Sequence, residues 1–126
     1  AIQLQQIFYR MTKYFIENFN TANFLTEALY HSKAASYFTN YRVQHFIFVR
    51  TLIEQAQREG DICSDMNSYE IYTTLQSILI QPIIIKNNIL QQHKNEPLMD
   101  KLKLIDVSSE SSLQKRLRVA FKGLRP

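Results

Sequence analysis

The sequence predicts an all-α fold of five or six helices packed as an orthogonal and antiparallel bundle. Residues that break helices are scarce, because the 126 residues include only two Gly and three Pro. Apolar residues make up 45% of the chain, and they recur at steps of three and four, the spacing of one helical face. At this length the helices form a single domain, residues 1–126, with a core of its own.

The N-terminal third predicts two helices and a loop. Residues 2–19 keep a helical repeat of apolar side chains. Residues 20–23 are polar and include good N-cap candidates, so a short second helix is expected over 24–31. Residues 32–36 are expected to form a loop or a loosened turn.

The centre of the chain predicts a pair of antiparallel helices joined at Gly60. Residues 37–59 have a helical apolar stripe, and a glycine just past its end suits the left-handed backbone that commonly ends a helix. After a connector over 61–66, Asn67 and Glu70 stand at the spacing of a capping box, which marks the start of the next helix.

The second long helix is expected over residues 69–92, with an unusual middle. The segment 78–85 is apolar on every side of a helix and rich in β-branched residues, so a strand is the alternative. Pro82 disfavours a central strand, and the periodic flanks favour a helix that is kinked at this proline.

The C-terminal part predicts a loop and a final helix. Residues 93–107 are mostly polar, contain Pro97 and have room for one short helix. Residues 109–124 then form a charged helix with a narrow apolar stripe, capped by Ser108 or Ser109. A narrow stripe of this kind is typical of a seam between two helices.

The charge of the chain is concentrated at one end. The net charge is +4 at pH 7, whereas residues 111–126 alone carry five cations and no acid. Cations on the solvent side of a helix C-terminus account for this better than a nucleic-acid footprint, which spreads over a face. Direct nucleic-acid binding by the terminal helix is the less favoured alternative.

Enzymatic, metal and cofactor chemistry have no support in the sequence. Two glycines cannot build a phosphate-binding loop, and no nucleophile elbow is present. The three His are far apart, without metal-ligand spacing. The acidic connector 61–67 lacks the glycine and the late glutamate of a calcium loop. Cys63 stands near two aspartates, which discourage formation of a thiolate.

The sequence also favours a cytoplasmic protein without a membrane span. The longest apolar run, residues 78–85, is far shorter than the roughly 20 residues that cross a bilayer. No secretory signal is visible in the first residues. Cys63 is the sole cysteine, which suits a reducing compartment.

A surplus of aromatic residues predicts either a solid core or an apolar pocket between the first helix and the helix over 37–59. Tyr hydroxyls and one imidazole would orient a small ligand in such a pocket. His45 lies on an apolar stripe, where a histidine with one hydrogen bond is more common than a catalytic one. The candidate pocket residues are Phe8, Met11, Tyr14, Phe15, Tyr41, His45 and Phe48.

A helix that is apolar all round is buried all round, which a chain of this size achieves most easily with a second copy of itself. A second subunit is therefore expected to cover this helix. The candidate interface residues are Leu75, Ile78, Leu79, Ile83, Ile84, Leu113, Leu117 and Phe121.

The order of these features resembles the C-terminal domain of TetR-like transcriptional repressors. The resemblance rests on TLIEQAQREGDICSDMNSYEIYTTL, a long helix ending in a glycine and an acidic linker, and on LQKRLRVAFKGLRP, a closing helix that ends in Gly-Leu. It extends over nearly the whole chain. The sequence departs from the family in lacking a small Gly around residues 74–83, and it contains no helix-turn-helix.

The resemblance implies an effector-binding and homodimerising domain, whose first helices enclose a pocket for a small apolar or amphipathic molecule. It also implies that the helices over 69–92 and 109–124 pack against their copies as a four-helix dimer interface. DNA binding would belong to an N-terminal helix-turn-helix that is missing from this chain. The alternative is a helical adaptor that binds a partner protein through the same apolar faces, without a small ligand.

Overall fold

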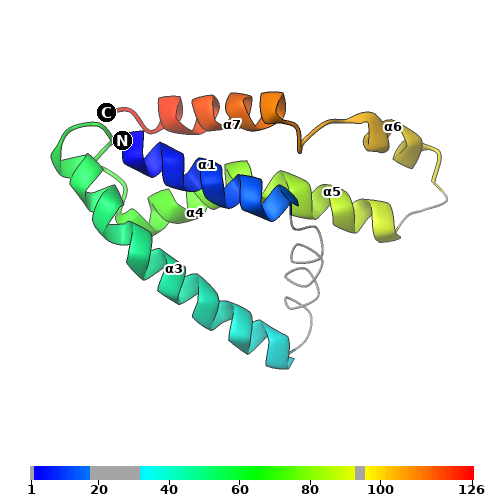
Figure 1. Ribbon diagram of the computed structural model, residues 1–126, viewed down its shortest axis with the longest axis horizontal. Helices are drawn as coiled ribbons and strands as arrows, with labels where there is room; N and C mark the ends of the chain where they lie inside the picture. The colour runs from blue at the N-terminus through cyan, green and yellow to red at the C-terminus, as the bar shows by residue number, and fades with distance from the viewer. Residues whose placement is uncertain (1, 18–31, 93–95) are drawn as a thin grey trace.

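A computed structural model of the chain describes residues 2–17, 32–92 and 96–126. This part of the chain contains six helices and no strand, which confirms the all-α prediction. Helices α1, α4 and α7 pack side by side, and α3 runs away from them at an angle (Figure 1). The helices are α1 Ile2–Glu17, α3 Ser32–Arg58, α4 Ser68–Leu79, α5 Gln81–Gln92, α6 Leu98–Leu104 and α7 Glu110–Gly123.

Helix α3 begins earlier than the sequence predicted. The expected loop over residues 32–36 is the first turn and a half of this helix. Its residues include Ala34 and Ala35, strong helix formers, and no Gly or Pro interrupts them, so the stretch extends the helix that follows. The short helix expected over 24–31 lies outside the described residues.

The turn between α3 and α4 confirms the predicted stop and restart. Gly60 has φ +79°, the left-handed conformation that glycine adopts at least cost. The Asn67 side chain accepts from the amide of Glu70 at 2.9 Å, and the Glu70 carboxylate accepts from the amide of Asn67 at 3.3 Å. The Gln57 side chain donates to two carbonyl oxygens of the loop and fixes it against α3.

The helix predicted over 69–92 is divided into α4 and α5 at Ile80. Pro82 has no amide hydrogen and cannot continue the helical ladder, and two following amides both bond to the Ile80 carbonyl. The Leu79 carbonyl accepts instead from Nη2 of Arg116 on α7, at 3.0 Å. The kink predicted at the proline is confirmed. The Leu79 carbonyl is available to Arg116 because the Ile83 amide, which would bond to it in a continuous helix, bonds to Ile80 instead.

The main core lies among α1, α3, α4 and α7. Leu75 is fully buried at its centre, where α4 faces both α3 and α7. A second, smaller cluster lies further along, where Phe15 of α1 packs with Ile83 and Ile84 of α5. The N-cap of α7 is Ser109, one of the two predicted serines, and its side chain accepts from the amide of Ser112.

Candidate functional site

Three polar or polarisable side chains meet where α1, α3 and α4 pack together. Nδ1 of His45 on α3 lies 2.7 Å from the hydroxyl oxygen of Tyr72 on α4. Nε2 of the same ring lies 2.7 Å from the sulfur of Met11 on α1. One imidazole therefore bridges all three helices.

The chemistry of the two partners assigns the tautomer of the imidazole. A thioether sulfur only accepts hydrogen bonds, so the proton belongs on Nε2, facing Met11. Nδ1 of His45 then accepts from the hydroxyl of Tyr72. The neutral ring satisfies both contacts, whereas a protonated ring would need Tyr72 to reverse its hydrogen bond.

Aromatic rings enclose this polar bridge. Tyr72 is 6% exposed, and its ring centroid lies 5.3 Å from that of Phe46, 5.4 Å from that of His45 and 6.3 Å from that of Phe8. Tilted rings at these separations attract each other through their quadrupoles. Tyr69 extends the group outward, edge-on to Phe46 at 5.7 Å. We call Phe8, Met11, His45, Phe46 and Tyr72 the imidazole cluster.

The imidazole cluster contains three of the residues predicted to line a pocket, Phe8, Met11 and His45. Phe46 and Tyr72 were not among the pocket residues predicted from the sequence. Tyr72 stands three residues before Leu75 on the apolar stripe of α4, so the helical repeat already indicated that its ring points inward. Its partner on another helix had no signal in the sequence.

The other predicted pocket residues lie elsewhere. Phe15 is buried in the second cluster, against α5. Tyr14 and Phe48 point to solvent, with 62% and 64% of their surfaces exposed. The side chain of Tyr41 lies outside the described residues. The structure thus gathers part of the predicted set and disperses the rest.

Burial lowers the pKa of His45 below its ordinary value of 6.5, because the surroundings disfavour the charged ring. The unfolded chain therefore binds a proton more readily than the folded chain does. We expect stability to be unaffected by this group above pH 6.5 and to fall as the pH drops through and below that value. Thermal unfolding midpoints measured from pH 7.5 to 5.5 check this.

The matched variant for this prediction is His45→Gln, which keeps a polar side chain but does not titrate. Subtracting its pH profile from that of the wild type cancels every other titrating group. Parallel profiles for the two proteins would contradict a buried neutral imidazole.

The residues predicted to form a dimer interface are, with one exception, buried within the chain itself. Helix α4 packs on both α3 and α7, and Ile83 and Ile84 of α5 pack with Phe15 of α1. Contacts inside one chain therefore account for the burial of these residues. Ile78 alone remains partly exposed. The buried members are Leu75, Leu79, Ile83, Ile84, Leu113, Leu117 and Phe121.

A different stripe faces outward on the same helices. On α4 and α5 it contains Ile78, Pro82, Ile85 and Ile89, at steps of four, three and four residues. All four are exposed or partly exposed. On α7, Val119 is exposed and lies between Arg116 and Gly123. The Arg116 side chain reaches across to α4. We call the side chains of residues 78, 82, 85, 89 and 119 the outward stripe.

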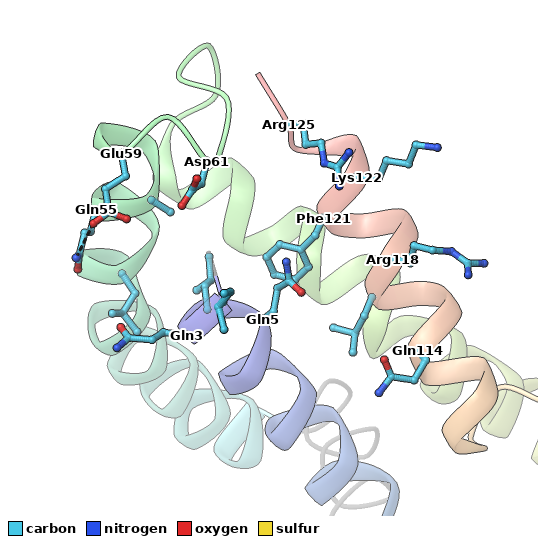
Figure 2. A pocket seen from close by; sticks show the side chains of 15 residues that line it. Gln3, Gln5, Gln55, Glu59, Asp61, Gln114, Arg118, Phe121, Lys122 and Arg125 are labelled. Carbon is cyan, nitrogen blue, oxygen red and sulfur yellow. Dashed lines mark hydrogen bonds between the residues drawn. The ribbon is translucent and has the colours of Figure 1, made fainter.

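A cleft of about 920 Å³ lies at the start of α1, away from the imidazole cluster. The first turn of α1, the last turns of α3 with the start of the following loop, and residues 114–125 on and just past α7 line it (Figure 2). The backbone amide of Cys63 donates to the Leu124 carbonyl at 2.8 Å and holds the α3–α4 loop beside the end of α7. We call this cleft the terminal groove.

Cys63 lies partly buried in the loop between α3 and α4. Burial raises the pKa of the Cys63 thiol, and a hydrogen bond with Asp65 raises it further, which agrees with the expected inert thiol. The described part of the chain holds no group of three His, Cys, Asp or Glu that could bind a metal ion. Among its helices, none is both long enough and apolar enough to cross a membrane.

Comparisons with known proteins identify no relative of this chain. No protein-family model matches the chain, and no curated protein or solved structure matches it either.

Proposed function

We propose that this chain is the effector-sensing and homodimerising domain of a TetR-like transcriptional repressor. The all-α bundle, its long helix ending at Gly60 and its terminal helix ending in Gly-Leu support the proposal. In this proposal, DNA is bound by a helix-turn-helix that is not part of these 126 residues.

The imidazole cluster is the observation that carries the sensing part of the proposal. A donor–acceptor pair, Tyr72 and His45, sits among apolar rings at the junction of three helices. Small-molecule sites are typically built this way, from apolar walls with few polar groups that fix the orientation of the ligand. An amphipathic effector would exchange its own polar group for the contact of His45 with Met11 or Tyr72.

The outward stripe supports the dimerisation part. Its isoleucines on α4 and α5 are exposed or partly exposed, and Val119 is an exposed apolar residue on α7. Two copies related by a two-fold axis would cover these side chains with four helices. An effector that moves Tyr72 on α4 would then act on the partner through the same helix, provided that it binds the two states unequally.

A binding experiment with Tyr72→Phe tests the sensing role. The probes are 1-anilinonaphthalene-8-sulfonate and a panel of phenolic and aliphatic carboxylate compounds that compete with it. We expect compounds with a hydrogen-bonding group to lose affinity by about five-fold, since one buried hydrogen bond contributes roughly 1 kcal/mol. Tyr69→Phe, on a tyrosine that is largely exposed, is the control.

Two results would contradict the sensing role. One is a panel in which no compound displaces the probe from the wild-type protein. The other is an equal loss in the Tyr69 and Tyr72 variants, which would place binding on the surface and favour the helical adaptor instead.

A further inference from the structure

Three exposed cations form a line along α7. Lys115, Arg118 and Lys122 follow one another at steps of three and four residues, which places them on one face of the helix. Leu113 and Ala120, on the opposite face, are buried in the core. Figure 2 shows that the side chains of Arg118 and Lys122 extend away from the terminal groove. We call Lys115, Arg118 and Lys122 the cationic ridge.

No described acid neutralises the cationic ridge. None of its side chains forms an ion pair with a carboxylate of the described residues. Glu110, the acid of α7, accepts a hydrogen bond from Tyr9 at 2.7 Å and lies 3.8 Å from Lys13. Glu59 and Asp61 lie on the α3 side of the terminal groove, from which the ridge side chains drawn in Figure 2 extend away. The positive charge of the ridge therefore remains available to a partner.

The helix dipole explains only part of this line of charge. Cations stabilise a helix within its last turn, and Lys122 is the ridge residue that stands there. Arg118 and Lys115 stand about one and two turns earlier, where this effect has faded. The interpretation favoured by the sequence, cations near a helix C-terminus, thus accounts for one of the three.

The composition of this face decides which kind of polyanion fits. A protein interface usually has an aromatic or aliphatic core, and a helix that lies in a membrane surface inserts an apolar face. The exposed face of α7 has one apolar side chain, Val119, because the apolar stripe of the helix is buried. Nucleic-acid interfaces are more polar and much more positively charged. A nucleic-acid backbone is therefore the partner that matches the ridge.

A duplex fits the ridge better than a single strand does. Proteins that bind single strands stack the bases on aromatic rings, whereas Phe121, the one aromatic residue of α7, is buried. The ridge extends about 10 Å along the helix axis, from the rise per residue of an α-helix. Duplex DNA presents about six phosphates over that length of its axis.

We propose that the cationic ridge of α7 binds the phosphate backbone of duplex DNA without regard to base sequence. Each of the three cations contacts one phosphate, and the planar guanidinium of Arg118 suits two oxygens of the same phosphate. Contacts of this kind position a protein on the duplex and carry no sequence information. The proposal goes beyond the proposed function, because it depends neither on the effector site nor on a helix-turn-helix.

Fluorescence anisotropy of the 126-residue chain with labelled DNA tests the proposal. The probes are two duplexes of unrelated sequence, each of about 20 base pairs, or two helical turns. We expect both to bind with the same affinity. Release of counterions from three phosphates gives a slope of about −2.7 for the logarithm of the binding constant against that of the salt concentration. This slope corresponds to about a 20-fold loss of affinity for each three-fold rise in salt.

Removing the charges of the ridge makes the test specific. Lys115→Gln with Arg118→Gln and Lys122→Gln should abolish binding, since these side chains make all the phosphate contacts. Each single substitution should make the salt slope less steep by about 0.9. All three residues are exposed, and circular dichroism verifies that the variants remain helical.

The matched control is Arg58→Gln with Lys101→Gln and Lys103→Gln. It removes the same number of charges from exposed positions on α3 and α6. This variant should keep the salt slope of the wild type, because net charge alone does not create the contacts.

Competition distinguishes DNA from the other polyanions. The competitors are vesicles containing phosphatidylglycerol and a poly-glutamate peptide, each matched to the DNA in concentration of charge. Both should displace the labelled duplex less well than unlabelled duplex does. The proposal is overturned if no duplex binds at low salt, if the control variant loses as much affinity as the ridge variant, or if vesicles or peptide compete as well as DNA.

Discussion

Replacing Ile85 by Glu is expected to convert a dimer into a monomer without unfolding it, whereas Ile84→Glu should unfold the chain. Ile85 is 52% exposed on the outward stripe, so a carboxylate there remains in water until a partner covers it. Ile84 is 6% exposed, against Phe15 in the second cluster. A charge buried there without a partner costs several kcal/mol, a large part of the stability of a small domain.

Sedimentation velocity at micromolar concentration and thermal unfolding measure the two effects separately. The Ile85 variant should sediment as a monomer with a far-ultraviolet circular dichroism spectrum like that of the wild type. The Ile84 variant should lose helical signal at temperatures where the wild type keeps it. A wild-type protein that is already monomeric would remove the dimerisation part of the proposed function, and a stable Ile84 variant would contradict the packing of α5.

Phe8→Ala is expected to lower the free energy of unfolding by about 3–5 kcal/mol, the usual effect of truncating a buried Phe. Phe8 is 1% exposed and packs against Tyr72, so the substitution leaves a cavity between α1 and α4. The lost contacts also loosen the imidazole cluster, since Met11 follows one turn later on the same helix. Urea denaturation followed by circular dichroism gives the difference in unfolding free energy.

Tyr14→Ala is the matched control on the same helix, because Tyr14 belonged to the same predicted pocket yet lies at the surface. Its expected effect is smaller than that of Phe8→Ala, because truncating a side chain that is 62% exposed leaves no cavity in the core. A similar loss in both variants would show that Tyr14 also packs inward. A loss of less than about 1 kcal/mol for Phe8→Ala would indicate an open pocket around this residue in place of solid packing.

The local rules predicted most of the fold from the sequence. The turn at Gly60, the capping box at Asn67, the kink at Pro82 and the cap at Ser109 each depend on a few neighbouring residues, and each is confirmed. The start of α3 was missed because residues 32–36 have only a weak apolar repeat. Helix propensity favours continuation of the helix through these residues, so it predicts the start of α3 better than the apolar repeat does.

The run of isoleucines over 78–85 shows why the interface residues were harder to place. On α4 the buried face ends with Leu79, and after the break at Ile80 the buried residues of α5 are Ile83 and Ile84. The break rotates the buried face, so a segment containing the end of one face and the start of the next is apolar on all sides. Without the break, the same pattern predicts one helix that needs a second chain to cover it.

The candidate site was limited by a different ambiguity. Tyr14 and Phe15 are adjacent aromatic residues on one helix, and periodicity alone does not choose which of them faces inward. The contacts of His45 with Met11, 34 residues away in the sequence, and with Tyr72, 27 residues away, depend on how three helices cross. Such crossings depend on the packing of the whole bundle, so the sequence of any one helix does not predict them.

The hydrogen bond from Arg116 to the Leu79 carbonyl links α7 to the joint between α4 and α5. A helix normally closes its own hydrogen bonds, so bending it concerns that helix alone. Here the acceptor at the bend is held by a guanidinium from α7. A change in the angle between α4 and α5 would therefore strain or break a hydrogen bond to the terminal helix.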